Sequence, residues 1–97
     1  MILTVLEARI APERSADLQD GYRALAARTR PAGLISSQLL RASADPELWR
    51  IETVWRDRQA LDAMRTQGVP AGVVLFREAG TEPTLSLFEV VDTLATR

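Results

Sequence analysis

The side chains best suited to chemistry in this sequence are hydrogen-bond donors rather than nucleophiles. Trp55 offers an indole N–H and a flat stacking surface, Thr53 offers a hydroxyl and Tyr22 a phenol. The 97 residues contain no Cys, His, Lys or Asn. This composition excludes thiolate nucleophiles, Schiff bases and imidazole bases, and it removes the commonest metal ligands, so no metal site is expected. A base working near pH 7 would have to be a carboxylate whose pKa is raised by burial.

The overall composition is ordinary for a soluble globular chain, with 46% hydrophobic residues, 26% charged residues and a net charge of −1. We expect one domain over residues 1–97. No basic block could follow a phosphate backbone, so nucleic acid is not an expected partner. The apolar runs are too short to span a membrane, and the first residues lack the pattern of a secretory signal. A cytoplasmic location is therefore expected.

The elements that must position these side chains begin with a strand over residues 2–10, where the side chains alternate between two faces. Pro12 then marks a helix start. The helix presents a buried stripe at helical spacing, formed by Leu18, Tyr22, Leu25 and Thr29. Pro31-Ala32-Gly33 ends this element and turns the chain. Tyr22 is thus expected to face the core with its hydroxyl at the rim.

Two further strands, 34–42 and 48–55, are expected to form an antiparallel hairpin because a short polar turn joins them. The second of these strands places four side chains on one face, namely Trp49, Ile51, Thr53 and Trp55. Asp57 is the expected N-cap of a helix over about 58–67. The apolar positions of that helix are Leu61 and Met64.

The last third of the sequence predicts a short helical segment that begins at Pro70 and ends at Gly80. Its apolar run over residues 73–76 is also compatible with a strand, and both interpretations stay open. A final strand is expected over residues 84–92, where apolar residues again fall on both faces.

The order β-α-β-β-α-β predicts an α+β, ferredoxin-like fold with a four-stranded antiparallel sheet. Helices can cover only one face of such a sheet. We expect the other face to pack on a second copy, which would give a homodimeric α/β barrel. That face carries charges suited to pairing at an interface, at Glu7, Arg9, Arg50 and Glu52. The alternative is that these residues lie on the solvated face of a monomer.

Several stretches, taken in order along the chain, resemble one known family. They are Pro31-Ala32-Gly33-Leu34-Ile35, Ser37-Gln38-Leu39-Leu40-Arg41, Asp45-Pro46 and Trp55-Arg56-Asp57-Arg58-Gln59-Ala60-Leu61. The set is similar to the antibiotic biosynthesis monooxygenase domain, over essentially the whole chain. The resemblance implies a dimeric α/β barrel with a pocket between sheet and helices, and no cofactor. Some members of that family oxygenate quinols or polyketide aromatics without metal or flavin, and others degrade heme.

The resemblance carries over one functional position and loses four. Trp55 matches the family's tryptophan at the end of the third strand and is the catalytic candidate. Polyketide-oxidising members have an Asn four residues before it and a Tyr six after, where this sequence has Ile51 and Leu61. Quinol-type members have an acid two before it and a His nine after, where this sequence has Thr53 and Met64. Heme-degrading members need a His and an Asn, so heme chemistry is not expected.

The expected pocket surrounds Trp55, and its other predicted residues are Trp49, Ile51, Thr53, Tyr22, Leu61 and Met64. Several of them also have a structural interpretation. Trp55 could be a core residue that staples the third strand to the next helix, and Trp49 could cover the sheet beside the 43–46 turn. Met64 could simply fill a gap in the core.

Two functions fit these observations. The first is a monooxygenase-type domain that acts without cofactor on a small hydrophobic aromatic, quinol or polyketide-like molecule, held as an electron-rich anion beside O₂. The alternative is a non-catalytic homodimer of the same fold that binds a small ligand or is purely structural. A cavity on the order of a few hundred Å³ touching Trp55 would favour ligand binding, and a filled core would favour a structural role.

Overall fold

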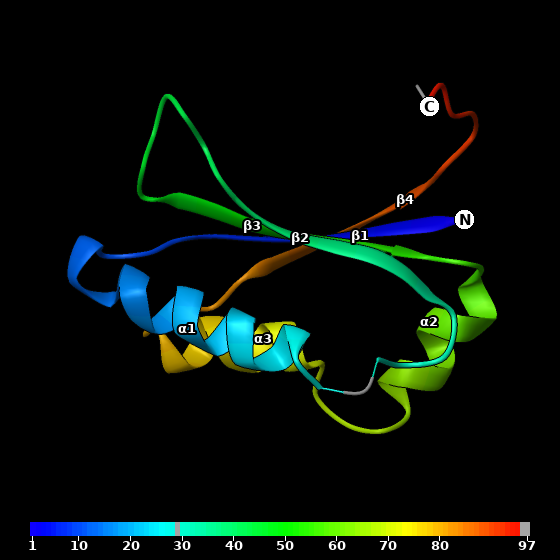
Figure 1. Ribbon diagram of the computed structural model, residues 1–97, viewed down its shortest axis with the longest axis horizontal. Helices are drawn as coiled ribbons and strands as arrows, with labels where there is room; N and C mark the ends of the chain where they lie inside the picture. The colour runs from blue at the N-terminus through cyan, green and yellow to red at the C-terminus, as the bar shows by residue number, and fades with distance from the viewer. Residues whose placement is uncertain (29, 96–97) are drawn as a thin grey trace.

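A computed structural model describes residues 1–28 and 30–95 of the chain and shows a four-stranded sheet with helices on one side (Figure 1). The elements are β1 (Ile2–Arg9), the 3-10 turn η1 (Pro12–Arg14), α1 (Ser15–Ala26), β2 (Leu34–Arg41), β3 (Leu48–Trp55), α2 (Arg58–Arg65), α3 (Ala71–Glu78) and β4 (Thr84–Glu89). The strand order is β2-β3-β1-β4, and all neighbours are antiparallel. The expected ferredoxin-like βαββαβ fold is therefore confirmed.

The two central strands, β1 and β3, pair over their whole length, from Ile2 opposite Trp55 to Arg9 opposite Leu48. Because side chains alternate along a strand, this register puts one row from each strand on the helix side of the sheet. That row is almost fully buried and consists of Thr4, Leu6, Ala8, Trp49, Ile51, Thr53 and Trp55. The alternation of side chains expected from the sequence for these two strands is therefore observed, and the buried half of it forms the core.

Helices α1 and α3 lie side by side beneath the sheet (Figure 1). α1 follows directly on the turn that Pro12 opens, and it buries Leu18 at 1% exposure. α3 buries Phe76, and Ala79, three residues further on at its C-cap, is buried as well. The segment after Pro70 is therefore a helix and the strand interpretation is wrong, because one side of this segment is buried at helical spacing. No helix of the described residues could cross a membrane.

Helix α2 lies apart from the other two, beyond the end of β3 (Figure 1). The Asp57 carboxylate accepts a hydrogen bond from the Ala60 backbone N–H at 2.8 Å, so the predicted N-cap is confirmed. This hydrogen bond is the main reason that the pKa of the Asp57 carboxyl lies below its usual value, and the hydrogen bond from the neighbouring Arg56 lowers the pKa further. The cap is therefore ionised at neutral pH and fixes the sharp turn from β3 into α2.

Some expected boundaries differ from those in the structure. β4 ends at Glu89 rather than 92, because Glu89 already pairs with Ile2 at the start of β1 and the chain beyond has no further strand to pair with. One last backbone bond joins Val90 N–H to the Met1 carbonyl at 2.9 Å. α2 ends at Arg65 rather than 67. Thr29, expected on the stripe of the first helix, lies outside the described residues.

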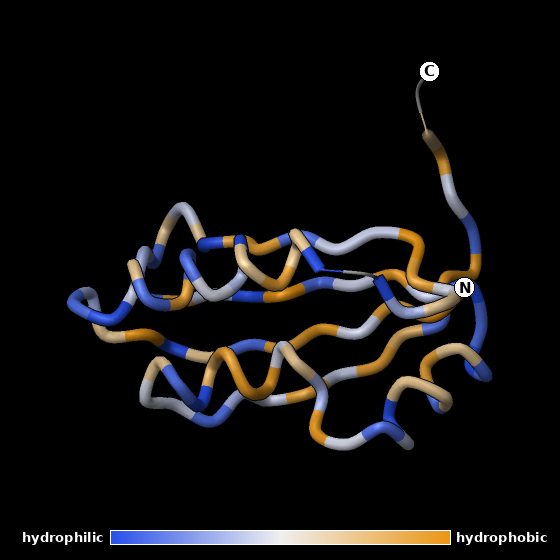
Figure 2. The backbone as a smooth tube through the Cα atoms, turned by 60° about the horizontal axis from the view of Figure 1, so that its bottom comes forward, coloured by the Kyte–Doolittle hydropathy of each residue, from blue (hydrophilic) through white to orange (hydrophobic). Residues whose placement is uncertain are grey.

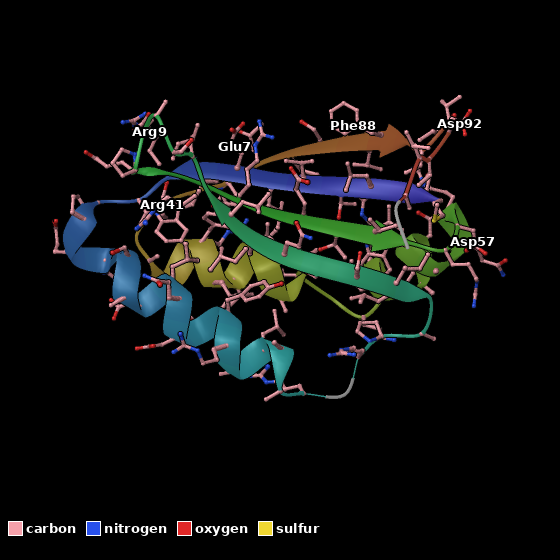
Figure 3. All side chains as sticks on the ribbon, turned by 45° about the horizontal axis from the view of Figure 1, so that its top comes forward. Glu7, Arg9, Arg41, Asp57, Phe88 and Asp92 are labelled. Carbon is pink, nitrogen blue, oxygen red and sulfur yellow. The ribbon has the colours of Figure 1, made fainter. Side chains whose placement is uncertain are left out.

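The face of the sheet opposite the helices carries no second layer in the described part of the chain (Figure 1). Phe88, Glu7 and Arg9 project from this open face in Figure 3. After β4, residues 90–95 form an arm that leaves the body of the domain, as Figure 2 shows. The fold thus covers one face of the sheet with helices and leaves the other face uncovered by the described residues.

Candidate functional site

Two apolar clusters fill the space between the sheet and its helices. The larger cluster is built on the hairpin end of the sheet from Leu6, Ala8, Ile10, Leu18, Trp49, Ile51, Phe76 and Ala79. The smaller cluster joins Trp55 at the end of β3 to Ala60 and Leu61 of α2, with Leu34 and Met64 packed against it. Because α2 stands apart from α1 and α3, the two clusters do not merge into one core.

A cavity of about 430 Å³ is lined by members of both clusters. Its apolar wall includes Leu6 of the larger cluster, Leu25 of α1, and three residues of the smaller cluster, Leu34, Trp55 and Met64. Its polar lining consists mainly of hydroxyl groups, at Thr4, Tyr22, Ser36, Ser37 and Thr53. A cavity of this size lies within the range of small-molecule pockets, roughly 300–1,000 Å³.

A chain of hydroxyl groups runs along one side of the cavity, from α1 to the centre of the sheet. The Tyr22 phenol donates a hydrogen bond to Ser37 Oγ at 2.8 Å. Ser37 Oγ in turn lies 3.2 Å from Thr53 Oγ1. The antiparallel pairing of β2 with β3 places Ser37 directly opposite Thr53, and Tyr22 reaches them from the buried side of α1.

Trp55 is held by a second set of hydrogen bonds beside this chain. Its indole N–H donates to Thr4 Oγ1 at 3.2 Å, and the Thr4 hydroxyl donates to the Thr53 carbonyl at 3.4 Å. The side chain is only 4% exposed. The indole N–H is therefore engaged within the protein, and what Trp55 presents to the cavity is its ring surface.

These groups can bind and orient an aromatic molecule, but they provide little acid–base chemistry of their own. Hydroxyl groups both donate and accept, so the chain from Tyr22 to Thr53 can hold a ligand oxygen in either protonation state. None of the described lining residues is a carboxylate, and Arg30 is the one charged residue among them. A carboxylate shifted by burial, the one route to a base left open by the composition, is therefore not found among these described residues.

The structure brings together four of the predicted site residues and separates three. Tyr22, Thr53, Trp55 and Met64 line the cavity. Trp49, Ile51 and Leu61 are buried in the two clusters and are not among the lining residues. For Trp49, alternation along the strand could not show this, because Trp49 and Trp55 are six positions apart, which is about 20 Å in an extended strand.

Trp49 is a core residue with a different environment from Trp55. Its indole nitrogen is buried and has no hydrogen-bond partner among the described residues. The Arg41 guanidinium lies over its ring, 5.5 Å from the centroid. Trp49 thus packs at the hairpin end of the sheet, in line with its structural interpretation.

Sequence reasoning missed Thr4, Ser37 and Arg30. Thr4 interrupts the apolar row of β1, and a polar residue at a core position is a signal that a partner is needed. Ser37 likewise lies at a half-buried position of β2. Arg30 had no such signal, because its place at the cavity depends on how the chain between α1 and β2 folds back.

The bond from Trp55 to Thr4 makes a testable prediction. Replacing Thr4 with Val removes the acceptor and leaves a buried indole N–H without a partner. We expect the Thr4→Val variant to lose about 1–3 kcal/mol of unfolding free energy, measured by urea denaturation.

The same substitution in a Trp55→Phe background provides the control, because no indole N–H is then left to be satisfied. The cost of Thr4→Val should fall by about 1 kcal/mol in that background. An equal cost in both backgrounds would show that the hydrogen bond makes no contribution.

Comparison with known proteins agrees with this architecture. The family model for antibiotic biosynthesis monooxygenase matches residues 1–68. No curated protein sequence matches the chain. Among solved structures, the chain is similar to a mutant of SnoaB, a cofactor-independent oxygenase from Streptomyces nogalater, with 19% identity over 98% of this chain and 97% of that one and a TM-score of 0.66.

Two further structures show the same fold. An antibiotic biosynthesis monooxygenase is 22% identical, with a TM-score of 0.71, over 95% of this chain and 100% of the other. A mutant of MhuD with two manganese protoporphyrin IX bound per active site is 20% identical, with a TM-score of 0.74, over 99% and 100% of the two chains. Since the family model covers more than half of the sequence, the chain belongs to the antibiotic biosynthesis monooxygenase family.

Proposed function

We propose that this protein is a monooxygenase that acts without cofactor on a small hydrophobic aromatic molecule of quinol or polyketide type. The observation that carries the proposal is the cavity beside Trp55, with its apolar wall and its chain of hydroxyl groups. A purely structural dimer would have a filled core at this place. Family membership supports the reaction class, and SnoaB, of the same fold, is a cofactor-independent oxygenase.

The proposed reaction inserts one oxygen atom of O₂ into an electron-rich substrate anion. For an anthrone-type substrate, the CH₂ group loses a proton and the resulting carbanion reduces O₂. A C–O bond forms, and loss of water leaves a carbonyl, so that the second oxygen atom and both hydrogens depart as water. The substrate supplies all four electrons, so no external reductant is needed.

In this reaction the protein would bind the substrate, orient it and exclude water from it. The Ser37 hydroxyl, which accepts a hydrogen bond from Tyr22, would donate its own proton to the substrate oxygen and so stabilise negative charge as it develops. Trp55 would stack against the ring system. Thr4, which holds the indole N–H, would act as a positioning residue for Trp55.

The alternative is a non-catalytic protein of the same fold that binds a small ligand. One observation favours it. The described lining residues contain no carboxylate, and the sequence has no His. A substrate must therefore ionise without a base from the described lining, or be acidic enough to ionise unaided. The two functions share the cavity and differ only in turnover.

A heme-dependent function does not fit the residues present. The fold is shared with MhuD, which binds manganese protoporphyrin in its active site. This chain has no His or Cys to serve as an axial ligand. In the cavity, the Tyr22 hydroxyl is already engaged with Ser37. The side chains of this cavity therefore suit a free aromatic molecule better than a porphyrin.

Oxygen uptake with anthrone- or naphthoquinol-type substrates tests the proposed reaction. We expect turnover above the buffer blank, and a Tyr22→Phe variant should lower kcat by about tenfold, the equivalent of one lost hydrogen bond. Thr66→Ala, which removes an exposed hydroxyl at the C-terminal end of α2 and outside the cavity lining, is the matched control and should leave turnover unchanged.

Two other results would redirect the assignment. Binding of the same compounds without oxygen uptake would leave the ligand-binding alternative in place and refute the enzyme. Failure of both binding and uptake would refute both functions of the cavity.

We further propose that the open face of the sheet is a homodimer interface. Apolar side chains on this face include Leu3, Val5, Val54 and Phe88, and Phe88 is 53% exposed. The predicted charges pair within the chain, since Arg50 binds Glu7 at 3.1 Å and Glu52 at 3.4 Å. Paired charges cost less to bury than single ones, so the face can meet a second copy of itself.

The remaining predicted interface residue, Arg9, is paired at the edge of this face. It binds Asp45 in the turn between β2 and β3, with a second contact at 3.2 Å, and this hydrogen bond lowers the pKa of the Asp45 carboxyl. The arm after β4 adds two almost fully exposed apolar residues, Val91 at 92% and Leu94 at 100%. A second copy would give this arm a surface to cover.

Light scattering at micromolar concentration tests the dimer. The wild-type protein should have twice the monomer mass, and Phe88→Asp should have the monomer mass because it places an unpaired charge in the interface. Val69→Asp is the matched control, since Val69 is similarly exposed, at 56%, but lies between α2 and α3. A monomeric wild type, or equal masses for the two variants, would contradict the interface.

A further inference from the structure

The cavity has one charged residue in its described lining, and that residue is an arginine. Arg30 lies in the connection between α1 and β2, next to Pro31, which also lines the cavity. It is exposed, so its guanidinium is at the mouth rather than in the interior. The hydroxyl groups of Tyr22, Ser37 and Thr53 belong to the part-buried lining.

The surroundings of Arg30 leave its charge available to a ligand. The other lining residues from the connecting segments and the start of α3 include Pro31, Pro70 and Ala71, none of which carries a charge. Arg30 takes part in none of the eight ion pairs found among residues 1–28 and 30–95. Most of the other described arginines do form an ion pair with an acidic side chain, as Arg56 does with Asp57.

We propose that the cavity selects aromatic molecules that carry an anionic oxygen, with Arg30 binding the anion at the mouth and the ring system lying against Trp55. A guanidinium presents a planar fork of donors that matches a carboxylate or a similar pair of anionic oxygens. This inference rests on the proposed function only in requiring that the cavity is a ligand site. It names the ligand class as aromatic acids and their ionised phenol or enol equivalents.

An anionic ligand also fits the chemistry available in the cavity. The described lining has no carboxylate to remove a proton and none to repel an anion. A ligand that enters already ionised needs no base from the protein, and Arg30 would favour its ionised form. The missing base and the available cation therefore point to the same class of molecule.

Calorimetric titration with a matched pair of probes, 2-naphthoate and neutral 2-naphthylmethanol, tests this selection at low and high salt. Wild-type protein should bind the anion about tenfold more tightly at low salt, as expected for a charge-assisted hydrogen bond. The preference should shrink as salt rises, because the site is open to solvent. Arg30→Gln should abolish the preference and leave the affinity for the neutral probe within about twofold.

Arg28→Gln is the control, because Arg28 carries the same charge two residues away, is exposed and does not line the cavity. It should keep the preference, and Arg30→Lys should keep part of it. Retention of the full preference in Arg30→Gln would overturn the inference. Equal wild-type affinity for the two probes would overturn it while leaving the proposed function intact, and binding of neither probe would overturn both.

Discussion

The register between β1 and β3 is the constraint on which the rest of the structure depends. It sets Thr4 opposite Thr53 and Ile2 opposite Trp55, so that the Trp55 indole can reach the Thr4 hydroxyl across the strand pair. A slip of one residue would turn each of these side chains to the other face of the sheet. The same register aligns Leu6, Ala8, Trp49 and Ile51 as the floor of the larger apolar cluster. The buried row of side chains on β1 and β3 thus forms the core at its hairpin end and lines the cavity at its other end.

The two ends of this row pack differently because they differ in residue composition and in the helices that cover them. At the hairpin end, large apolar side chains meet Leu18 and Phe76, which are almost completely buried. At the other end the row changes to Thr53 and Thr4, and the chain after β3 turns away into α2 under the control of the Asp57 cap. Space remains between the two packed regions, and internal hydrogen bonds join the hydroxyl groups of Tyr22, Ser37 and Thr53 in its lining. Such a cavity would accommodate the proposed aromatic ligand without requiring a buried ion.

Much of the fold could be predicted from the sequence, because alternation and helical spacing are local. The β2–β3 hairpin, the Asp57 cap and the face that holds Trp55 follow from patterns within a few residues of one another. The site depends on contacts between distant segments, and there the sequence was less informative. Thr4 and Trp55 are 51 residues apart, and no local pattern links them. Trp49 shared a face with Trp55, yet distance along the strand places it in the core, and Arg30 reaches the cavity only through the path of a loop.

The most direct test of a ligand site beside Trp55 uses the two indole N–H groups, which report on the two ends of the row. Nuclear magnetic resonance can follow both during titration with a naphthol-type ligand. We predict that the Trp55 indole resonance shifts and saturates, together with the amides of Ser37 and Thr53, while the Trp49 resonance stays in place. A shift of the Trp49 resonance without that of Trp55, or no shift in either, would contradict a ligand site at this end of the sheet.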